Sequence, residues 1–341
     1  MKMNELKGRL RAAREHTRLV VDDLAGEREL GPKLAIVNPP RWEVGHVGWF
    51  QEYWCLRGGS EERASILPNA DALYNSATVP HDTRWDLPLP SFADTVAYRD
   101  EVLDRVLGRL ENADPYFVEL AIRHELMHAE AFHYTRQTLG YPAPFAEKAV
   151  AIDGPNEDLE MRGGVFRLGA PRGNGFAFDN EKWSHPVVLE PFRIARRPVT
   201  YGEYRKFADP PYCKDGKLRR FDRWIPIPVH EPVRHVSWEQ ANAYCAFAGR
   251  RLPSEAEWEC AALAGLENVG HVWEWTSSTF LPYPGFVRDP YKEYSEPWFA
   301  THKVLRGASF ATPPGVAHAR FRNFYTPERG DIFAGFRTCA L

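Results

Sequence analysis

From Met1 to Leu139, apolar positions recur every three or four residues, which is the period of an α-helix with one buried face. Four segments carry this pattern, and proline-rich or polar breakers separate them: residues 6–24, 41–57, 91–110 and 115–140. The last of these has no glycine or proline between Pro115 and Gly140. Four successive amphipathic helices predict an up-and-down bundle.

Beyond Gly140 the pattern changes to short apolar runs separated by many turns. Pro142 and Pro144 begin a linker, and four later runs have the length and composition of strands: residues 163–170, 186–200, 302–310 and 332–339. Residues 238–249 and 254–265 look helical, and Ser254 with Glu257 three residues later predicts a capping box. We therefore expect a multidomain protein: an all-α four-helix bundle over residues 1–145, then an α+β domain over residues 152–341.

The third feature is the run His124-Glu125-Leu126-Met127-His128 in the fourth predicted helix. Residues four apart share one helix face, with Cβ atoms about 5–6 Å apart. His124 and His128 are therefore placed to bind one metal ion. Two imidazoles leave a metal under-coordinated, so a further ligand must come from elsewhere in the fold.

The literal pattern is H-E-x-x-H, which in zinc proteases combines two ligands with a glutamate base. The longer protease form needs a glycine and a third histidine where this chain has Ala131 and Tyr134, and His133 misses by one position. A zinc hydrolase therefore remains open but is disfavoured. A second alternative is that both histidines belong to an ordinary amphipathic helix.

His46 is the candidate third ligand. It lies in the middle of the second predicted helix, between Gly45 and Gly48, whose small size allows a neighbouring helix or a metal to approach closely. Ligands in helical bundles project inward from facing helices. A lone histidine on an apolar face is more often a core residue than a ligand, so His46 depends on its partners for this assignment.

Composition limits the remaining classes of function. The chain has 341 residues, enough for two domains, with 43 Lys+Arg against 46 Asp+Glu and a formal net charge of −3. No basic run indicates nucleic acid or a membrane surface, and the amphipathic N-terminus lacks the apolar core of a signal peptide. We expect a cytoplasmic protein, a monomer or weak homo-oligomer, with small-molecule partners. Its five scattered cysteines predict free thiols.

Several segments carry a family resemblance. RWEVGHVGWFQEYWCLR, LYNSATVPHDTRWDLPLP and RHELMHAEAFH resemble the DinB-type bundle of the ergothioneine-pathway sulfoxide synthases, which are non-haem iron enzymes. RRLPSEAEWECAA, VWEWTSS, VLRGASF and FRNFYTPERGDIFAGFRTC resemble the formylglycine-generating-enzyme-like domain, a C-type-lectin-related fold, that follows the bundle in that family. The resemblance covers nearly the whole chain.

The resemblance implies the metal, the substrates and several residue roles. It implies that Fe(II) is held by His46, His124 and His128, with about three coordination positions left for substrates and dioxygen. It implies that hercynine, a trimethylated histidine, is coupled oxidatively to a sulfur or selenium donor. Glu130 takes the place of a carboxylate that orients an imidazole, and Tyr291 that of a proton or electron donor.

Departures from the family pattern bear on specificity. Met127 stands where typical members have a glutamine on the hercynine side, whereas Asn323 and Phe324 are retained in kind. Tyr325 replaces an aspartate that binds the donor peptide, although Arg329 remains. A lost carboxylate removes a charge-assisted contact of about 1.5–3 kcal/mol. We therefore expect a donor other than gamma-glutamylcysteine.

The segments YNSATVPHDTRWDLPLP, YKEYSEPWF and FYTPERGDIFAGFRTC resemble the selenoneine synthase branch of this family. The resemblance implies a selenosugar donor, which offers hydroxyl groups and no carboxylate. A pocket with Tyr325 and Trp298 suits such a donor, and Arg84 is a further expected substrate contact. The alternative within the family is a sulfoxide synthase that uses a thiol such as cysteine.

Two other classes stay open. A copper oxidase like the formylglycine-generating enzymes needs a close cysteine pair late in the second domain, where only Cys339 occurs. The second open class is a catalytically silent module that binds a small thiol or sugar. The segment between Cys260 and Trp273 is shorter than expected for this domain, and we expect a shortened loop near residues 262–272, with a second uncertain loop near 210–220.

Overall fold

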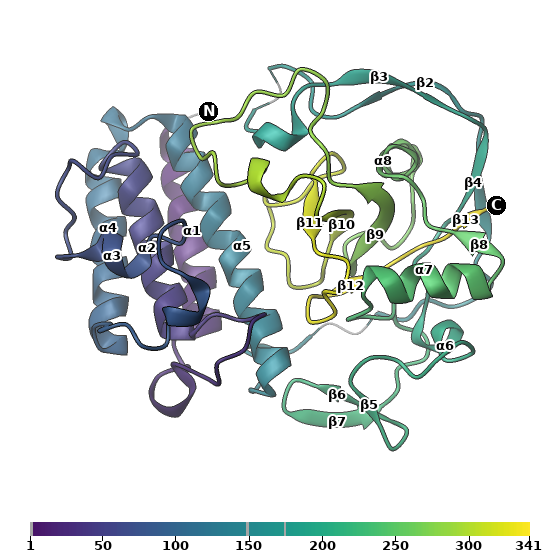
Figure 1. The fold of residues 1–341 in the computed structure, drawn as a ribbon, viewed down its shortest axis with the longest axis horizontal. Helices are drawn as coiled ribbons and strands as arrows, with labels where there is room; N and C mark the ends of the chain where they lie inside the picture. Colours follow the sequence, from purple (N-terminus) through teal and green to yellow (C-terminus); the bar gives the residue numbers. More distant parts are fainter. Residues whose placement is uncertain (1–2, 148–149, 174) are drawn as a thin grey trace. The chain divides into compact units, whose positions relative to one another are not determined.

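The computed structural model describes residues 3–147, 150–173 and 175–341 (Figure 1). The chain divides into two compact units, Met1–Ala146 and Glu147–Leu341. The predicted fold class, a helical bundle followed by an α+β domain, is confirmed. Within the described residues, no helix is both long enough and apolar enough to cross a membrane.

The first unit contains four long helices that lie side by side (Figure 1). They are α1 (Met3–Val21), α2 (Pro40–Cys55), α4 (Phe92–Arg109) and α5 (Pro115–Leu139). Helix α2 packs against both α4 and α5, and α1 packs against α5. Shorter pieces connect them: α3 (Ala70–Tyr74) and the 3₁₀ helices η1 (Gly26–Arg28), η2 (His81–Thr83) and η3 (Leu110–Asn112). The sequence pattern did not predict α3.

Local sequence sets the ends of the helix that carries the histidine motif. Asp114 caps the N-terminus of α5 by accepting a hydrogen bond from the Tyr116 N–H, and Pro115 occupies the first turn. Gly140 ends the helix with φ of 69°, a left-handed conformation that glycine adopts without steric strain. The predicted bounds of this helix are therefore confirmed.

Two glycines let other chain segments approach α2. A Cβ added at Gly45 would collide with the Tyr74 ring, which contacts the helix there. At Gly48 an added Cβ would lie 3.0 Å from the Cα of Arg99 on α4. The predicted close approach is thus made by Tyr74 and by the α4 backbone, and it brings both against the helix that carries His46.

The second unit holds short strands in four sheets (Figure 1). One sheet has the order β1 (Asp158–Met161), β4 (Phe192–Ala195), β13 (Cys339–Ala340) and β8 (Arg250–Arg251). A second has the order β11 (Asn323–Tyr325), β10 (Lys303–Ala308), β9 (Val272–Thr279) and β12 (Ala334–Gly335), with β12 parallel to β9. The hairpin β2 (Gly164–Leu168) and β3 (His185–Leu189) forms a third, and β5 (Cys213–Lys214), β6 (Lys217–Arg220) and β7 (Arg223–Pro226) form a fourth.

The α-helices of this unit begin at side-chain caps. They are α6 (Tyr201–Tyr204), α7 (Trp238–Phe247) and α8 (Glu255–Ala264). The unit also has the 3₁₀ helices η4 (Asp179–Glu181) and η5 (Glu296–Trp298), which lack such caps. The Ser254 hydroxyl accepts from the Glu257 N–H, and the Glu257 carboxylate accepts from the Ser254 N–H. The predicted capping box of α8 is therefore confirmed.

Two sequence predictions need correction in the second unit. The segments 186–200 and 332–339, each expected as one strand, are split into β3 with β4 and into β12 with β13. The three-stranded β5–β6–β7 sheet was missed because Asp215, Gly216 and Phe221 form tight turns with positive φ between very short strands. Such short strands give too few alternating positions for a periodic signal.

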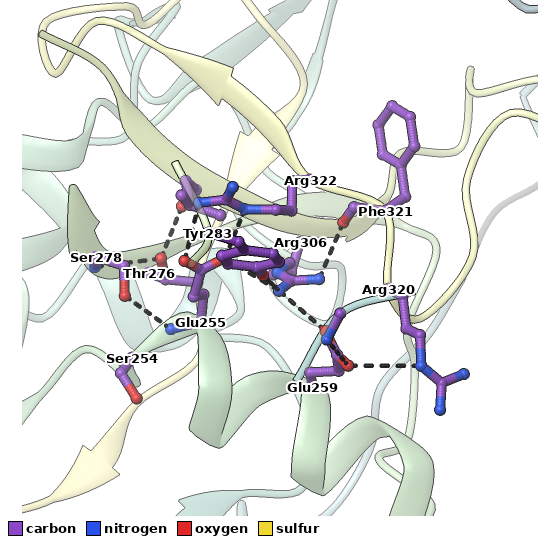
Figure 2. Close-up of polar contacts among 12 residues, drawn as sticks. Ser254, Glu255, Glu259, Thr276, Ser278, Tyr283, Arg306, Arg320, Phe321 and Arg322 are labelled. Atoms are coloured by element: carbon purple, nitrogen blue, oxygen red, sulfur yellow. Dashed lines mark hydrogen bonds and ion pairs between the residues drawn. The ribbon is translucent and has the colours of Figure 1, made fainter. Parts of the chain in front are cut away.

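The core of the second unit contains a buried ionic cluster (Figure 2). The Glu255 carboxylate accepts hydrogen bonds from Arg322 Nε at 2.9 Å and from Arg306 Nη2 at 3.0 Å, and the Tyr283 hydroxyl donates to it at 3.1 Å. Arg306 also lies 3.0 Å from Glu259. Because charges of both signs meet there, each is compensated although both arginine side chains are fully buried. Arg322 immediately precedes β11, so the cluster anchors that strand.

Candidate metal centre and substrate-binding residues

Three histidines converge inside the first unit. His46 on α2 and His124 and His128 on α5 each offer a ring nitrogen, and these atoms all lie within 4.8 Å of one another. The Nε2 atoms of His46 and His124 are 3.2 Å apart. Three imidazoles from two packed helices thus face one point, as the sequence analysis expected of a metal-binding cluster.

Hydrogen bonds to the far ring nitrogens orient two of the three imidazoles. His46 Nδ1–H donates to the carbonyl oxygen of Tyr74 at 2.8 Å, which leaves the Nε2 lone pair directed at the cluster. His128 Nδ1 lies 2.5 Å from a carboxylate oxygen of Glu43. Both arrangements fix the tautomer in which Nε2 is the available ligand atom.

Aromatic rings enclose the cluster. The Trp42 ring stacks on His46 with centroids 5.0 Å apart and an interplanar angle of 9°. Phe50 stacks on His124 at 3.5 Å and 5°. These contacts hold the imidazoles in one orientation and exclude water from two sides of the cluster.

The charge state of the imidazoles suits metal binding. Burial lowers the pKa of His46 and of His124 well below the ordinary histidine value, and the neighbouring His128 lowers both pKa values further. Both rings are therefore neutral at physiological pH, and a neutral imidazole is the form that donates a lone pair to a metal. A set of three imidazole nitrogen donors, two of them on buried rings, fits a divalent transition metal such as iron.

Glu125, the glutamate of the H-E-x-x-H pattern, does not lie free beside the histidines. It is fully buried, and its carboxylate accepts from Arg14 Nε at 2.7 Å and from Arg14 Nη2 at 3.3 Å. A carboxylate held in a buried ion pair is stabilised as the anion and is a poor base. This contact disfavours the zinc hydrolase alternative, which needs Glu125 to activate water.

The carboxylate beside His128 comes from α2. Glu43 contacts His128, whereas Glu130, which the sequence analysis expects to orient an imidazole, is buried on α5, and its role stays a prediction. The available signal was the spacing W-E-x-x-H, because Glu43 lies three residues before His46 and therefore on the same face of α2. It was missed because spacing alone does not say which helix α2 faces.

Two expected substrate contacts of the first unit lie near the cluster. Arg84 is buried, with its guanidinium 3.8 Å from the centroid of the Trp42 ring, and it donates to Asn38 Oδ1 and to the Val79 carbonyl. Burial lowers the pKa of Arg84 to about 10, partly offset by the negative charge of Glu43. Met127 is half-buried on α5, directly before His128.

The second unit brings most of its expected substrate residues to β11. Asn323, Phe324 and Tyr325 form this strand, and Phe324 stacks on Phe280 with centroids 4.0 Å apart. Arg329 lies 4.9 Å from the centroid of the Tyr325 ring, and two of its nitrogens donate to Asp331 at 2.6 and 2.7 Å. The carboxylate partner of Arg329 was not predicted.

Tyr291 and Trp298 lie on the segment between β9 and β10. The Tyr291 ring is 5.7 Å from Tyr294, which in turn lies 5.7 Å from Phe324. Burial raises the pKa of Tyr291 above the ordinary tyrosine value, and the neighbouring Glu293 adds to this. Trp298 is 42% exposed and donates to the Glu293 carbonyl, so its indole face is accessible.

The cysteines and several tryptophans of the second unit lie in its structural core. All five cysteines are free, and Cys339 is buried on β13. The indole rings of Trp258 and Trp275 are fully buried, whereas Trp224 is 49% exposed. The copper oxidase alternative requires two adjacent late cysteines, and the printed sequence has only one in that region.

Comparison with known families covers both units. The DinB superfamily matches residues 9–137, and the sulfatase-modifying factor enzyme 1-like domain matches residues 148–269 and 265–340. The two segments of the second match meet at residues 265–269, in the region where the sequence analysis expects a shortened loop.

Similar curated proteins agree with this division. A hercynine oxygenase of Mycolicibacterium smegmatis is 32% identical, over 97% of this chain and 97% of that protein. A hercynine oxygenase of Mycobacterium tuberculosis is 31% identical, over 89% of this chain and 91% of that protein. A formylglycine-generating enzyme of Streptomyces coelicolor is 31% identical but covers 53% of this chain, with 88% of its own length matched.

Proposed function

The chain belongs to the hercynine oxygenase family, and we propose that it is an Fe(II)- and dioxygen-dependent enzyme that couples hercynine to a selenium or sulfur donor. The observation that supports this is the cluster of buried His46 and His124 with half-buried His128, whose ligand nitrogens lie within 4.8 Å of one another. When bound there, iron supplies the activation of dioxygen. Three neutral imidazoles leave about three coordination positions for the reactants.

The protein's own residues bind and orient the reactants in this proposal. Asn323 and Phe324 contact hercynine, and Met127 provides an apolar surface on the hercynine side. Arg84 contributes a buried positive charge that favours a substrate carboxylate. Trp42 and Phe50 keep water from the histidine cluster, which strengthens every electrostatic contact within it.

For the donor we propose a selenosugar, as in the selenoneine synthase branch. Tyr325 offers an aromatic face and a hydroxyl group, and Trp298 offers an exposed indole on which a sugar stacks. Arg329 is already engaged by Asp331, so this ion pair presents little net charge to an incoming carboxylate. A donor with hydroxyl groups and no carboxylate fits these residues.

A thiol donor is the alternative, which would make the enzyme a sulfoxide synthase. The names of the similar proteins state hercynine and give no donor, so they favour the broader assignment over the selenium-specific one. Anaerobic reconstitution with Fe(II), followed by hercynine, dioxygen and one donor at a time, separates the two. Mass spectrometry should find the C–Se product with a selenosugar and little product with cysteine or gamma-glutamylcysteine. Coupling of the thiols alone overturns the selenium assignment.

We assign Tyr291 as the proton donor of the coupling step. Burial keeps its phenol protonated at physiological pH because the neutral form is favoured in an apolar environment. Tyr291→Phe should lower coupling by about 10²–10⁴-fold, the usual contribution of a general acid, and shift the products towards simple oxidation of the donor. Tyr294→Phe, three residues away, is the matched control and should leave the product ratio unchanged.

The two non-oxidative alternatives make opposite predictions in the same assay. A zinc hydrolase would bind zinc tightly and cleave peptides, which the Arg14–Glu125 ion pair disfavours. A binding module would consume no oxygen. Oxygen consumption that depends on both Fe(II) and hercynine excludes both, whereas its absence from a fully metallated protein would overturn the proposed function.

A further inference from the structure

The three histidines of the cluster differ in what holds their far ring nitrogens. His46 Nδ1–H donates to a neutral backbone carbonyl, that of Tyr74, at 2.8 Å. His128 Nδ1 instead lies 2.5 Å from a carboxylate oxygen of Glu43. Hydrogen bonds to an ionised acceptor are shorter and about twice as strong as neutral ones. His128 is therefore in a different electronic environment from His46.

Glu43 is well placed to act on the whole cluster. It is fully buried, and it lies one helical turn before His46 on α2, so both residues belong to one face of that helix. Through Glu43 and His46, α2 contacts the His128 and His124 side chains of α5. The carboxylate thus links the two helices at the point where the ligand nitrogens meet.

Charge explains what a carboxylate does there. Three neutral imidazoles around a divalent metal leave a net charge of about +2 in a buried site, which is costly in a low-dielectric environment. One adjacent carboxylate offsets part of that charge, as the directly bound carboxylate does in a centre with two histidines and one carboxylate. Arg84 is a positively charged residue near Glu43, and the two charges interact favourably.

We propose that Glu43 is a positioning residue of the metal centre that orients His128 and supplies the negative charge which three histidine ligands lack. This inference rests on the proposed function for the identity of the metal, but not for the existence of a metal site. Its consequence is that Glu43 raises the affinity for divalent metals and stabilises the ferric state relative to the ferrous state.

The test measures metal binding and redox potential without any substrate. Glu43→Ala removes the hydrogen bond and the charge, and Glu43→Gln keeps an acceptor oxygen but removes the charge. Loss of such an outer partner weakens metal affinity by about 10–100-fold. We expect Co(II) and anaerobic Fe(II) titrations to show the order wild type, Glu43→Gln, Glu43→Ala from tightest to weakest. Both variants should have a more positive Fe(III)/Fe(II) midpoint potential.

Glu52→Gln is the matched control on the same helix. Glu52 is also a fully buried carboxylate of α2, but it accepts from the Tyr98 hydroxyl, the Ser65 hydroxyl and the Ile66 N–H instead of a histidine. Its loss should lower the free energy of unfolding and leave metal affinity and midpoint potential unchanged. Thermal unfolding followed by circular dichroism identifies any variant that is not folded, in which case Glu43→Gln carries the test.

The outcomes separate this inference from the proposed function. If folded Glu43→Gln and Glu43→Ala bind Co(II) and Fe(II) as tightly as the wild type and keep its midpoint potential, the role of Glu43 is wrong. If the wild type binds metal with the expected dependence on Glu43 but consumes no oxygen with hercynine, the proposed function fails and this inference stands.

Discussion

The two units bury polar groups in different ways. In the second unit, buried charges are compensated by partners of opposite charge: Glu255 by Arg322 and Arg306, and Glu274 by Arg337. In the bundle, two buried imidazoles and one half-buried imidazole direct their Nε2 side at one another. Neutral imidazole rings that face each other compensate no charge, and their contact contributes little to the free energy of folding. The buried ionic cluster around Glu255 is satisfied by its own partners and stabilises the fold, whereas the histidine cluster is arranged to bind a ligand.

The same contrast is visible within the bundle. Arg14 and Glu125 form a closed buried pair, although Glu125 adjoins the ligand candidate His124 in sequence. A one-residue step along a helix turns a side chain by about 100°, so neighbours in sequence serve different environments. Proximity in sequence to a metal motif therefore does not identify a catalytic residue. The contacts of each side chain in the folded protein identify it.

The largest expected effect comes from removing one imidazole of the cluster. His46→Ala should weaken metal binding by more than about 100-fold, since loss of an outer partner alone costs up to that much, and should abolish hercynine-dependent oxygen consumption. Metal analysis after gel filtration measures the first and an oxygen electrode the second. His81→Ala is the control, because His81 lies in the same unit but outside the cluster, with its Nε2 on the Val37 carbonyl and its ring against Trp85. If His46→Ala kept the metal content of the wild type, the histidine cluster would not be a metal site and the contrast between the two units would be wrong.

Removing one partner of the buried ionic cluster should lower the free energy of unfolding and leave the metal site intact. Glu255→Ala leaves Arg322 and Arg306 buried without their carboxylate, which costs about 3–5 kcal/mol. Denaturant unfolding should show this loss in the second unit, while Co(II) affinity of the folded protein is unchanged. Glu296→Ala breaks an exposed pair with Arg288 and should change stability by less than about 1 kcal/mol.

A third prediction concerns a second buried histidine of the bundle. His133 is fully buried on α5, and neither ring nitrogen has a hydrogen-bond partner among residues 3–147, 150–173 and 175–341. Replacing unsatisfied polar groups by an apolar ring of similar shape relieves about 1–3 kcal/mol. His133→Phe should therefore raise the free energy of unfolding, whereas the same change at a satisfied histidine should lower it. A destabilised variant would show that His133 has a binding role.

The pH dependence of stability provides a second measurement on His133. Burial lowers its pKa to about 3 in the folded protein, and nearby His16 and Arg136 add to this. Below the unfolded value of about 6.5 the unfolded chain binds a proton that the folded protein does not. Stability is thus full above that pH and is lost as pH falls towards 3, with a slope of up to about 1.4 kcal/mol per unit. His133→Phe should reduce this slope.

The smallest expected effects compare helix caps in the two units. The Ser91 hydroxyl caps α4 by accepting from the Asp94 N–H and also donates to the Asp94 carboxylate, whereas Ser254 caps α8 in a reciprocal pair in which the Glu257 carboxylate accepts from the Ser254 N–H. Each serine-to-alanine change should cost about 1 kcal/mol. We expect the loss at Ser254 to be the larger of the two, because Glu257 then loses the geometry of its return bond. Thermal unfolding of the two variants in parallel measures the difference, and equal losses would contradict it.

The sequence by itself determined what depends on near neighbours in the chain. The period of apolar residues gave the four long helices, Asp114, Pro115 and Gly140 gave the ends of α5, and the spacing of His124 and His128 placed both on one face. These features need only local hydrogen bonds and steric preferences. The family resemblance then supplied His46, which spacing could not select.

Only the tertiary structure decided which partners meet. It showed that Glu43 contacts His128, that the Tyr74 carbonyl orients His46, and that Arg14 engages Glu125 from 111 residues away. Such contacts depend on the rotation of each helix about its axis, which the packing at Gly45 and Gly48 fixes. A sequence states which side chains share a face, but the opposing face is chosen by how the whole bundle packs.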